Sequence, residues 1–105
     1  MNDVDYRVES DKFFIKIEDE LGSYEWDFDY DNKGDIFIIY NNTQEYMVLT
    51  KNYSQHEIWL VAGKDAYQFI YENENWVSKK NKKESILGVV RRYLDIACGE
   101  KGQIF

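Results

Sequence analysis

Large apolar side chains recur at a nearly helical interval in the first twenty residues of the chain. They stand at Tyr6, Phe13, Phe14, Ile17 and Leu21. A repeat close to 3.6 residues is typical of an amphipathic helix with one face in a core. Asn2 or Asp3 suits the cap at its start, and Gly22 suits the position after its end. We therefore predict a helix over residues 3–21.

The pattern then changes from a helical repeat to a strict alternation of aromatic and acidic residues. The aromatic set is Tyr24, Trp26, Phe28 and Tyr30, and the acidic set between and after them is Glu25, Asp27, Asp29 and Asp31. Successive side chains of a strand point to opposite faces of a sheet. The alternation therefore predicts a strand over residues 24–31 with one aromatic face and one carboxylate face.

Five further short apolar stretches follow, separated by segments rich in Asn, Gly and Asp. They cover residues 36–40, 45–50, 57–61, 66–71 and 76–78. Short apolar runs between turn-forming residues are typical of strands joined as hairpins. The segment 24–78 therefore predicts a sheet of about six strands with tight connections.

A second helical repeat occupies residues 83–98, and Gly99 is the expected stop. Its predicted apolar face consists of Ile86, Leu87, Val90, Tyr93, Leu94 and Ala97. Short connections favour an antiparallel sheet, and two amphipathic helices at the ends of the chain need a surface to cover. We predict a two-layer α/β sandwich of the α+β class, with both helices on one face of the sheet and the other face open to water.

The size and composition are those of one folded domain over residues 1–105. Hydrophobic residues make up 44% and charged residues 31% of the chain, which excludes a disordered tail. The single cysteine, Cys98, excludes an internal disulfide, and with one histidine, His56, the chain lacks the set for a Cys/His zinc site. No apolar run approaches a membrane span, and no signal-peptide pattern is visible. We expect a cytoplasmic protein that has no membrane partner.

The net charge of −7 is concentrated in the first third of the chain. Residues 1–35 carry a net charge of −8 and residues 36–105 a net charge of +1. The segment 18–31 holds seven acids and no base, namely Glu18, Asp19, Glu20, Glu25, Asp27, Asp29 and Asp31. Such a surface would repel nucleic acid and would attract cations or a basic protein surface.

The spacing of these acids favours loosely held cations rather than a calcium-binding loop. Asp27, Asp29 and Asp31 imitate the start of an EF-hand loop, but the sixth position is Asn32 rather than Gly and the twelfth is Ile38 rather than Glu. Neighbours on one strand face stand roughly 6.5–7 Å apart, which is too far to chelate one small ion. Carboxylates alone suit Mg, Ca, Mn and iron. The alternative is a strand face that only meets water.

A second candidate surface surrounds Trp59. If Ile58 and Leu60 face the helices, alternation puts Trp59 and Glu57 together on the open face of the sheet. An exposed tryptophan often anchors a protein interface. The alternative is an inverted register that would place Trp59 in the core.

The remaining charged and nucleophilic residues predict no catalytic site. The basic residues of the second half gather at Lys79, Lys80, Lys82, Lys83, Arg91 and Arg92. A phosphate-binding patch is one interpretation of this group. We favour a solvated loop and helix face, because no aromatic platform or glycine-rich cradle accompanies it. His56 and Cys98 stand apart in sequence, with no set of nucleophile and base around them.

At these residues the chain resembles the frataxin family, and in particular its bacterial members. The likeness extends over residues 1–99 and is strongest in His-Glu-Ile-Trp-Leu at 56–60, Tyr-Gln-Phe at 67–69, Trp-Val at 76–77 and the acidic first helix and strand. The chain departs from the family pattern at Thr50, Asn52 and Glu57, where the family usually carries Asn, Gln and Gln.

The resemblance implies a frataxin-like sandwich that binds ferrous and ferric iron weakly and acts in iron–sulfur cluster assembly. It implies docking onto a cysteine desulfurase near the scaffold protein on which clusters are built. The implied metal-binding residues are Glu18, Asp19, Glu20, Glu25, Asp27, Asp29 and Asp31, with other divalent cations as further ligands. The resemblance implies that Trp59 binds the partner. We expect Glu57 and Asn52, which stand where the family usually carries Gln, to be partner-binding residues beside it.

We therefore expect an iron-binding regulator of cluster assembly that acts by docking and not as an enzyme. The resemblance also allows a ferroxidase or an iron-storage or iron-donor protein as the alternative, but no Glu-x-x-His motif accompanies the spaced acids. An acidic mimic of nucleic acid would fit the charge and would leave Trp59 unexplained. We expect a monomer, with oligomers as an option in the presence of iron.

Overall fold

The computed structural model describes residues 1–24 and 28–102, with side chains described as far as Cys98. Helix α1 (Asp3–Leu21) leads through a short 3₁₀ helix, η1 (Gly22–Tyr24), into the sheet, and helix α2 (Ile86–Gly102) follows it. The strands are β1 (Phe28–Asn32), β2 (Ile36–Asn41), β3 (Gln44–Asn52), β4 (Glu57–Ala62), β5 (Asp65–Glu72) and β6 (Asn75–Ser78). They form one antiparallel sheet in the order β1-β2-β3-β4-β5-β6.

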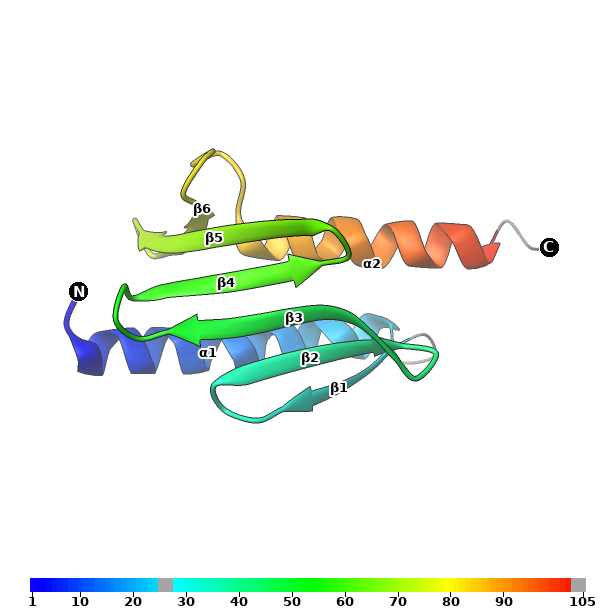
Figure 1. The fold of residues 1–105 in the computed structure, drawn as a ribbon, viewed down its shortest axis with the longest axis horizontal. Coiled ribbons are helices and arrows are strands. Elements are labelled where there is room, and N and C mark those ends of the chain that lie inside the picture. Colours follow the sequence, from blue (N-terminus) through cyan, green and yellow to red (C-terminus); the bar gives the residue numbers. More distant parts are fainter. Residues whose placement is uncertain (25–27, 103–105) are drawn as a thin grey trace.

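Both helices cover the same face of this sheet, and the opposite face carries no helix (Figure 1). The predicted sandwich with six strands and one open face is confirmed. No helix in the part of the chain that the structure describes is both long and apolar enough to cross a membrane.

The core lies between the helices and the covered face of the sheet. Helix α1 contributes the five apolar residues that the sequence pattern selected, and none of them is more than 6% exposed. Helix α2 contributes Ile86, Val90, Leu94 and Ala97 as predicted, and also Val89, which the predicted face omitted. The cap of α1 is Asn2, whose Oδ1 accepts a hydrogen bond from the backbone N–H of Asp5 at 2.7 Å.

Two hairpin connections depend on residues in the left-handed region. Asn42 and Thr43 join β2 to β3 with φ values of 54° and 66°, and Asn73 and Glu74 join β5 to β6 with φ values of 50° and 64°. Two successive positive φ angles give the two-residue turn whose twist matches that of antiparallel strands. These turns fix the registers on which the open face depends.

Three predicted boundaries were wrong by more than two residues, and others shifted by one or two. Tyr24 does not begin a strand, because it belongs to η1 and its hydroxyl donates to Asp95 of α2 at 2.6 Å. Residues 25–27 lie outside the described residues, and the strand begins at Phe28. Helix α2 begins later than residue 83, because Ser85 caps it by accepting the N–H of Gly88 at 3.1 Å. It also continues through residue 99, since a glycine inside a helix costs about 1 kcal/mol and does not by itself end it.

Tyr6 ties α1 to the sheet, and we expect its replacement by phenylalanine to change the pH dependence of folding. The Tyr6 side chain is buried, its hydroxyl donates to the carbonyl oxygen of Glu57 at 2.6 Å, and burial raises its pKa. Because the folded state favours neutral tyrosine, this contribution is fully present below about pH 10 and is lost above it, at about 1.4 kcal/mol per pH unit. Tyr6→Phe should lower stability near pH 7 by about 1 kcal/mol and flatten its alkaline decline.

Urea unfolding at pH 8 and at pH 11 measures both effects. Equal losses of stability between these pH values in the wild type and in Tyr6→Phe would show that Tyr6 does not govern the alkaline limb.

Candidate functional site

The last turn of α1 carries three consecutive carboxylates. Glu18 and Glu20 are half-buried and Asp19 is exposed, and the turn contains no base. The C-terminus of a helix carries the negative end of its dipole, so acids there are unfavourable and bases are favoured. This arrangement costs stability that a bound cation or a basic partner would restore.

Strand β1 places two further carboxylates at the edge of the sheet. Phe28 and Tyr30 point toward the helices, where Tyr30 stacks on Phe37 with a centroid distance of 5.3 Å. By alternation Asp29 and Asp31 point toward the open face, where Asp29 is exposed. We call the acids of α1 and β1 together, Glu18, Asp19, Glu20, Asp29 and Asp31, the acidic ridge. The predicted members Glu25 and Asp27 lie outside the described residues.

A side-chain hydrogen bond links the two halves of the acidic ridge. Asn32 at the end of β1 donates through Nδ2 to Glu18 Oε2 at 3.4 Å. Glu18 and Asp19 therefore lie on the helical side of the sheet edge, whereas Asp29 and Asp31 lie on its open side. The described carboxylates of the ridge lie on both sides of this sheet edge and do not face a common centre.

The fold brings bases to two of these acids, which the base-free run in the sequence did not indicate. Arg91 of α2 binds Glu20 through two hydrogen bonds of 2.7 and 3.1 Å, and its guanidinium lowers the pKa of Glu20. Lys33 lies 3.8 Å from Asp31. Glu20 and Asp31 are thus partly neutralised within the chain. Asp19 and Asp29 form no ion pair with any residue in the described part of the chain.

Among residues 1–24 and 28–98, no three His, Cys, Asp or Glu side chains converge as a metal site would require. The described carboxylates are spread along the ridge, so they suit cations held loosely by one or two oxygens each. Carboxylate oxygens placed in this way suit hard cations in general.

Trp59 lies on the open face of β4 and is half-buried. Its neighbours Ile58 and Leu60 are fully buried under the helices, so the register with Trp59 in the core does not occur. The indole Nε1 donates to Glu57 Oε1 at 2.7 Å, and Lys79 Nζ donates to Glu57 Oε2 at 2.9 Å. These bonds turn the polar edge of the indole toward Glu57 and orient the ring within the surface.

Glu57 is buried inside the domain, and Asn52 is half-buried with its side-chain oxygen engaged by the residues that follow β3. The Glu57 residue is only 3% exposed, because Trp59 and Lys79 cover a side chain that alternation alone would expose. Asn52, its register partner on β3, accepts hydrogen bonds through Oδ1 from Ser54 Oγ at 2.9 Å and from the Gln55 N–H at 3.1 Å. The geometry gives both residues a role in shaping the surface around Trp59.

A row of apolar side chains crosses the open face beside Trp59, and the sequence analysis did not single it out. Ile38, Val48 and Val61 are register partners on adjacent strands, and Val61 is 48% exposed. The signal was present in the strands, where every second residue of an apolar run points away from the helices. An open sheet face with an apolar row and a tryptophan is typical of an interaction surface.

Several of the other residues considered in the sequence have contacts within the domain. His56 Nε2 lies 2.7 Å from Asp3 Oδ1, and the ring stacks on Tyr6. In the basic loop Lys79 binds Glu57, and Lys82 binds Glu72 at 3.0 Å. Cys98 lies half-buried against the core. These contacts are structural, and none of them forms a pair of nucleophile and base.

Comparison with known proteins finds a matching family and similar chains. The model of the frataxin-like domain matches residues 1–100. The chain is 28% identical to the iron-sulfur cluster assembly protein CyaY of Pasteurella multocida over 104 residues, covering 99% of this chain and 96% of the relative. It is 24% identical to the CyaY of Neisseria meningitidis serogroup C over the same shares. The solved frataxin of Psychromonas ingrahamii superposes with a TM-score of 0.72 at 22% identity, covering 78% of each chain.

Proposed function

Because the chain belongs to the frataxin-like family, we propose that it is an iron-binding regulator of iron–sulfur cluster assembly. It carries ferrous or ferric iron weakly on the acidic ridge, and it docks onto a cysteine desulfurase and its scaffold protein. Docking, rather than covalent chemistry on this chain, is how it acts.

The observation that supports this proposal best is the run of carboxylates in the last turn of α1. Those acids oppose the helix dipole, and Asp19 and Asp29 remain without an ion pair in the described part of the chain. A surface that keeps a local excess of negative charge attracts cations and basic protein surfaces alike. Iron and the desulfurase would meet the same residues, so the binding of one would change the affinity for the other.

Trp59 and the apolar row supply the second part of the docking surface. The acidic ridge steers a basic partner and sets its orientation, while a desolvated tryptophan supplies most of the affinity. The open side of the ridge and the apolar row lie on the same face of the sheet, since Asp31 and Ile38 are register partners on β1 and β2. One partner surface can therefore contact both.

A ferroxidase or iron store is the alternative function. It would hold two iron ions through shared ligands. The described residues offer separate carboxylates and no converging group, so no observation on the described surface favours this alternative over the regulator.

We expect anaerobic titration with ferrous iron to broaden the amide resonances of residues 18–20 and 29–31 first. Each site should show a dissociation constant in the micromolar range or weaker, because one or two carboxylates hold each ion. The amides of His56 and Cys98 should remain sharp. Two-dimensional NMR of the labelled chain measures this directly.

The matched variants for this titration are Asp19→Asn with Asp29→Asn, and Asp5→Asn with Glu74→Gln. Both pairs remove two exposed acids, but only the first pair belongs to the acidic ridge. The first should weaken iron binding and the second should not. Tight binding centred on His56 or Cys98, or equal weakening by both pairs, would contradict a ridge site.

A further inference from the structure

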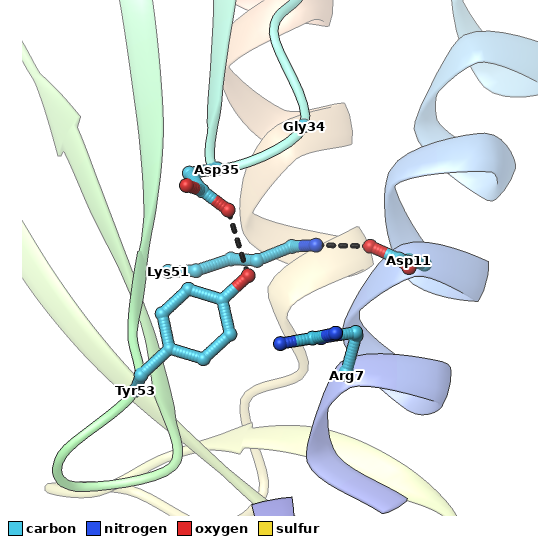
Figure 2. A pocket seen from close by; sticks show the side chains of 6 residues that line it. All are labelled: Arg7, Asp11, Gly34, Asp35, Lys51 and Tyr53. Atoms are coloured by element: carbon cyan, nitrogen blue, oxygen red, sulfur yellow. Dashed lines mark hydrogen bonds and ion pairs between the residues drawn. The ribbon is translucent and has the colours of Figure 1, made fainter. Parts of the chain in front are cut away.

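An open cavity of about 440 Å³ lies between α1, the β1–β2 turn and the end of β3, and its lining includes neither Trp59 nor a residue of the acidic ridge. Six residues line it, namely Arg7, Asp11, Gly34, Asp35, Lys51 and Tyr53. Figure 2 shows the charged side chains converging on one space from the two layers of the fold. The proposed function uses none of these residues.

Lys51 is the most deeply buried charged group of this cavity. Its side chain is 1% exposed, and its ammonium lies 4.9 Å from the centre of the Phe14 ring. Nζ donates to Asp11 Oδ1, so the second oxygen of Asp11 takes no part in this ion pair. Asp11 is half exposed at the cavity mouth, where that oxygen can accept a hydrogen bond from a ligand.

Asp35, on the opposite wall of the cavity, also has one carboxylate oxygen engaged by a side chain of the lining. Its Oδ1 accepts a hydrogen bond from the Tyr53 hydroxyl at 2.7 Å, and its carbonyl oxygen accepts the N–H of Lys51 at 2.9 Å. These bonds fix the β1–β2 turn against β3 and leave one carboxylate oxygen of Asp35 outside them. In each of the two carboxylates of the cavity, one oxygen is therefore bonded within the chain and the other can bind a ligand.

Arg7 is the unpaired cation of the cavity. Its guanidinium makes no hydrogen bond or ion pair with any residue that the structure describes. In Figure 2 it extends from α1 across the cavity toward Tyr53. A planar guanidinium that projects into a cavity without a partner is suited to hold a carboxylate through two parallel hydrogen bonds.

The charges of the lining select among small ligands. Two cations and two carboxylates give a formal charge of zero, so a phosphate would face two carboxylates and a divalent metal ion would face Arg7 and Lys51. A ligand that carries both charges a short distance apart can place each charge beside a lining group of opposite sign. We propose that this cavity binds a free α-amino acid, with its carboxylate on Arg7 and its ammonium group on the unused oxygen of Asp11 or of Asp35.

Titration of the full-length labelled chain with L-alanine, acetate, ethylamine and inorganic phosphate at constant ionic strength tests the proposal. L-Alanine should shift the amides of Gly34, Asp35 and Tyr53 in a saturable way in the millimolar range. It should bind at least about tenfold more tightly than acetate or ethylamine, because each of these carries only one of the two charged groups.

Arg7→Gln should weaken L-alanine binding at least about tenfold, since the carboxylate loses its bidentate partner. Lys12→Gln is the matched control, because it removes another exposed cation from the same helix outside the cavity. Thermal melts of both variants are the check that each one folds. No saturable shift, tighter binding of phosphate, equal binding of alanine and acetate, or equal effects of the two variants would overturn the proposal. Neither iron nor a desulfurase enters the experiment, so its outcome is independent of the proposed function.

Discussion

Replacing Trp59 with alanine is expected to weaken docking onto the cysteine desulfurase by at least about 30-fold, which corresponds to about 2 kcal/mol of binding free energy. Trp59 is a large aromatic side chain on the open face, next to an apolar row that includes the exposed Val61. Its ring would leave water on binding, whereas most other contacts at such an interface contribute little. Surface plasmon resonance or calorimetry with the purified desulfurase measures the change.

The variant should also lose some stability, because Trp59 is half-buried and not fully exposed. Its removal leaves Glu57 Oε1 without the indole donor, and an unpaired buried acceptor costs about 1–3 kcal/mol. Val61→Ala on the same strand and face is the control, and it should change docking less than about threefold. Docking is compared at a temperature where melts show each variant folded. Equal losses of affinity in Trp59→Ala and Val61→Ala would show that Trp59 does not supply most of the binding free energy.

The elements of the fold were predictable because local signals agreed with one another. Helix α1 has a helical repeat, a cap at Asn2 and a glycine after its end, and the six strands lie between turn-forming segments. Errors arose where a local signal was overruled by distant contacts. Tyr24 continues an alternating pattern in sequence, but its hydroxyl is held by Asp95, 71 residues away, and this contact raises the pKa of Tyr24 to about 12.

The candidate site was predictable in its composition and only partly in its electrostatics. A run of seven acids is visible in the sequence, but Arg91 reaches Glu20 only because α1 and α2 cover the same face. The burial of Glu57 also depends on Lys79, which follows β6, two strands away in the sheet. Pairings of this kind depend on tertiary placement, so alternation indicates a face without indicating which polar groups are free on it.

Reversing two charges of the acidic ridge, Asp19→Lys with Asp29→Lys, is expected to abolish most docking while preserving the fold. Both side chains are exposed and make no ion pair in the described part of the chain, so no internal contact is lost. Lysine at position 19 should even stabilise α1 by about 0.3–1 kcal/mol, since it complements the negative end of the helix dipole. Docking onto a basic surface should weaken at least about 100-fold, or roughly 3 kcal/mol, because attraction becomes repulsion.

The control reverses two exposed acids outside the ridge, Asp5→Lys with Glu74→Lys, which changes the net charge by the same amount. If the acidic ridge is the docking surface, this variant keeps most of its affinity, and only the ridge variant loses it. Wild-type docking should also weaken steeply between about 50 and 500 mM salt, as the Debye length falls from roughly 14 to 4 Å. The ridge variant should lose much of that salt dependence, because two of the three ridge acids that remain, Glu20 and Asp31, are already paired with bases of the chain. Wild-type affinity in the ridge variant, or equal losses of affinity in both double variants, would show that the docking surface lies elsewhere. The lysines of residues 79–83 would then be tested next.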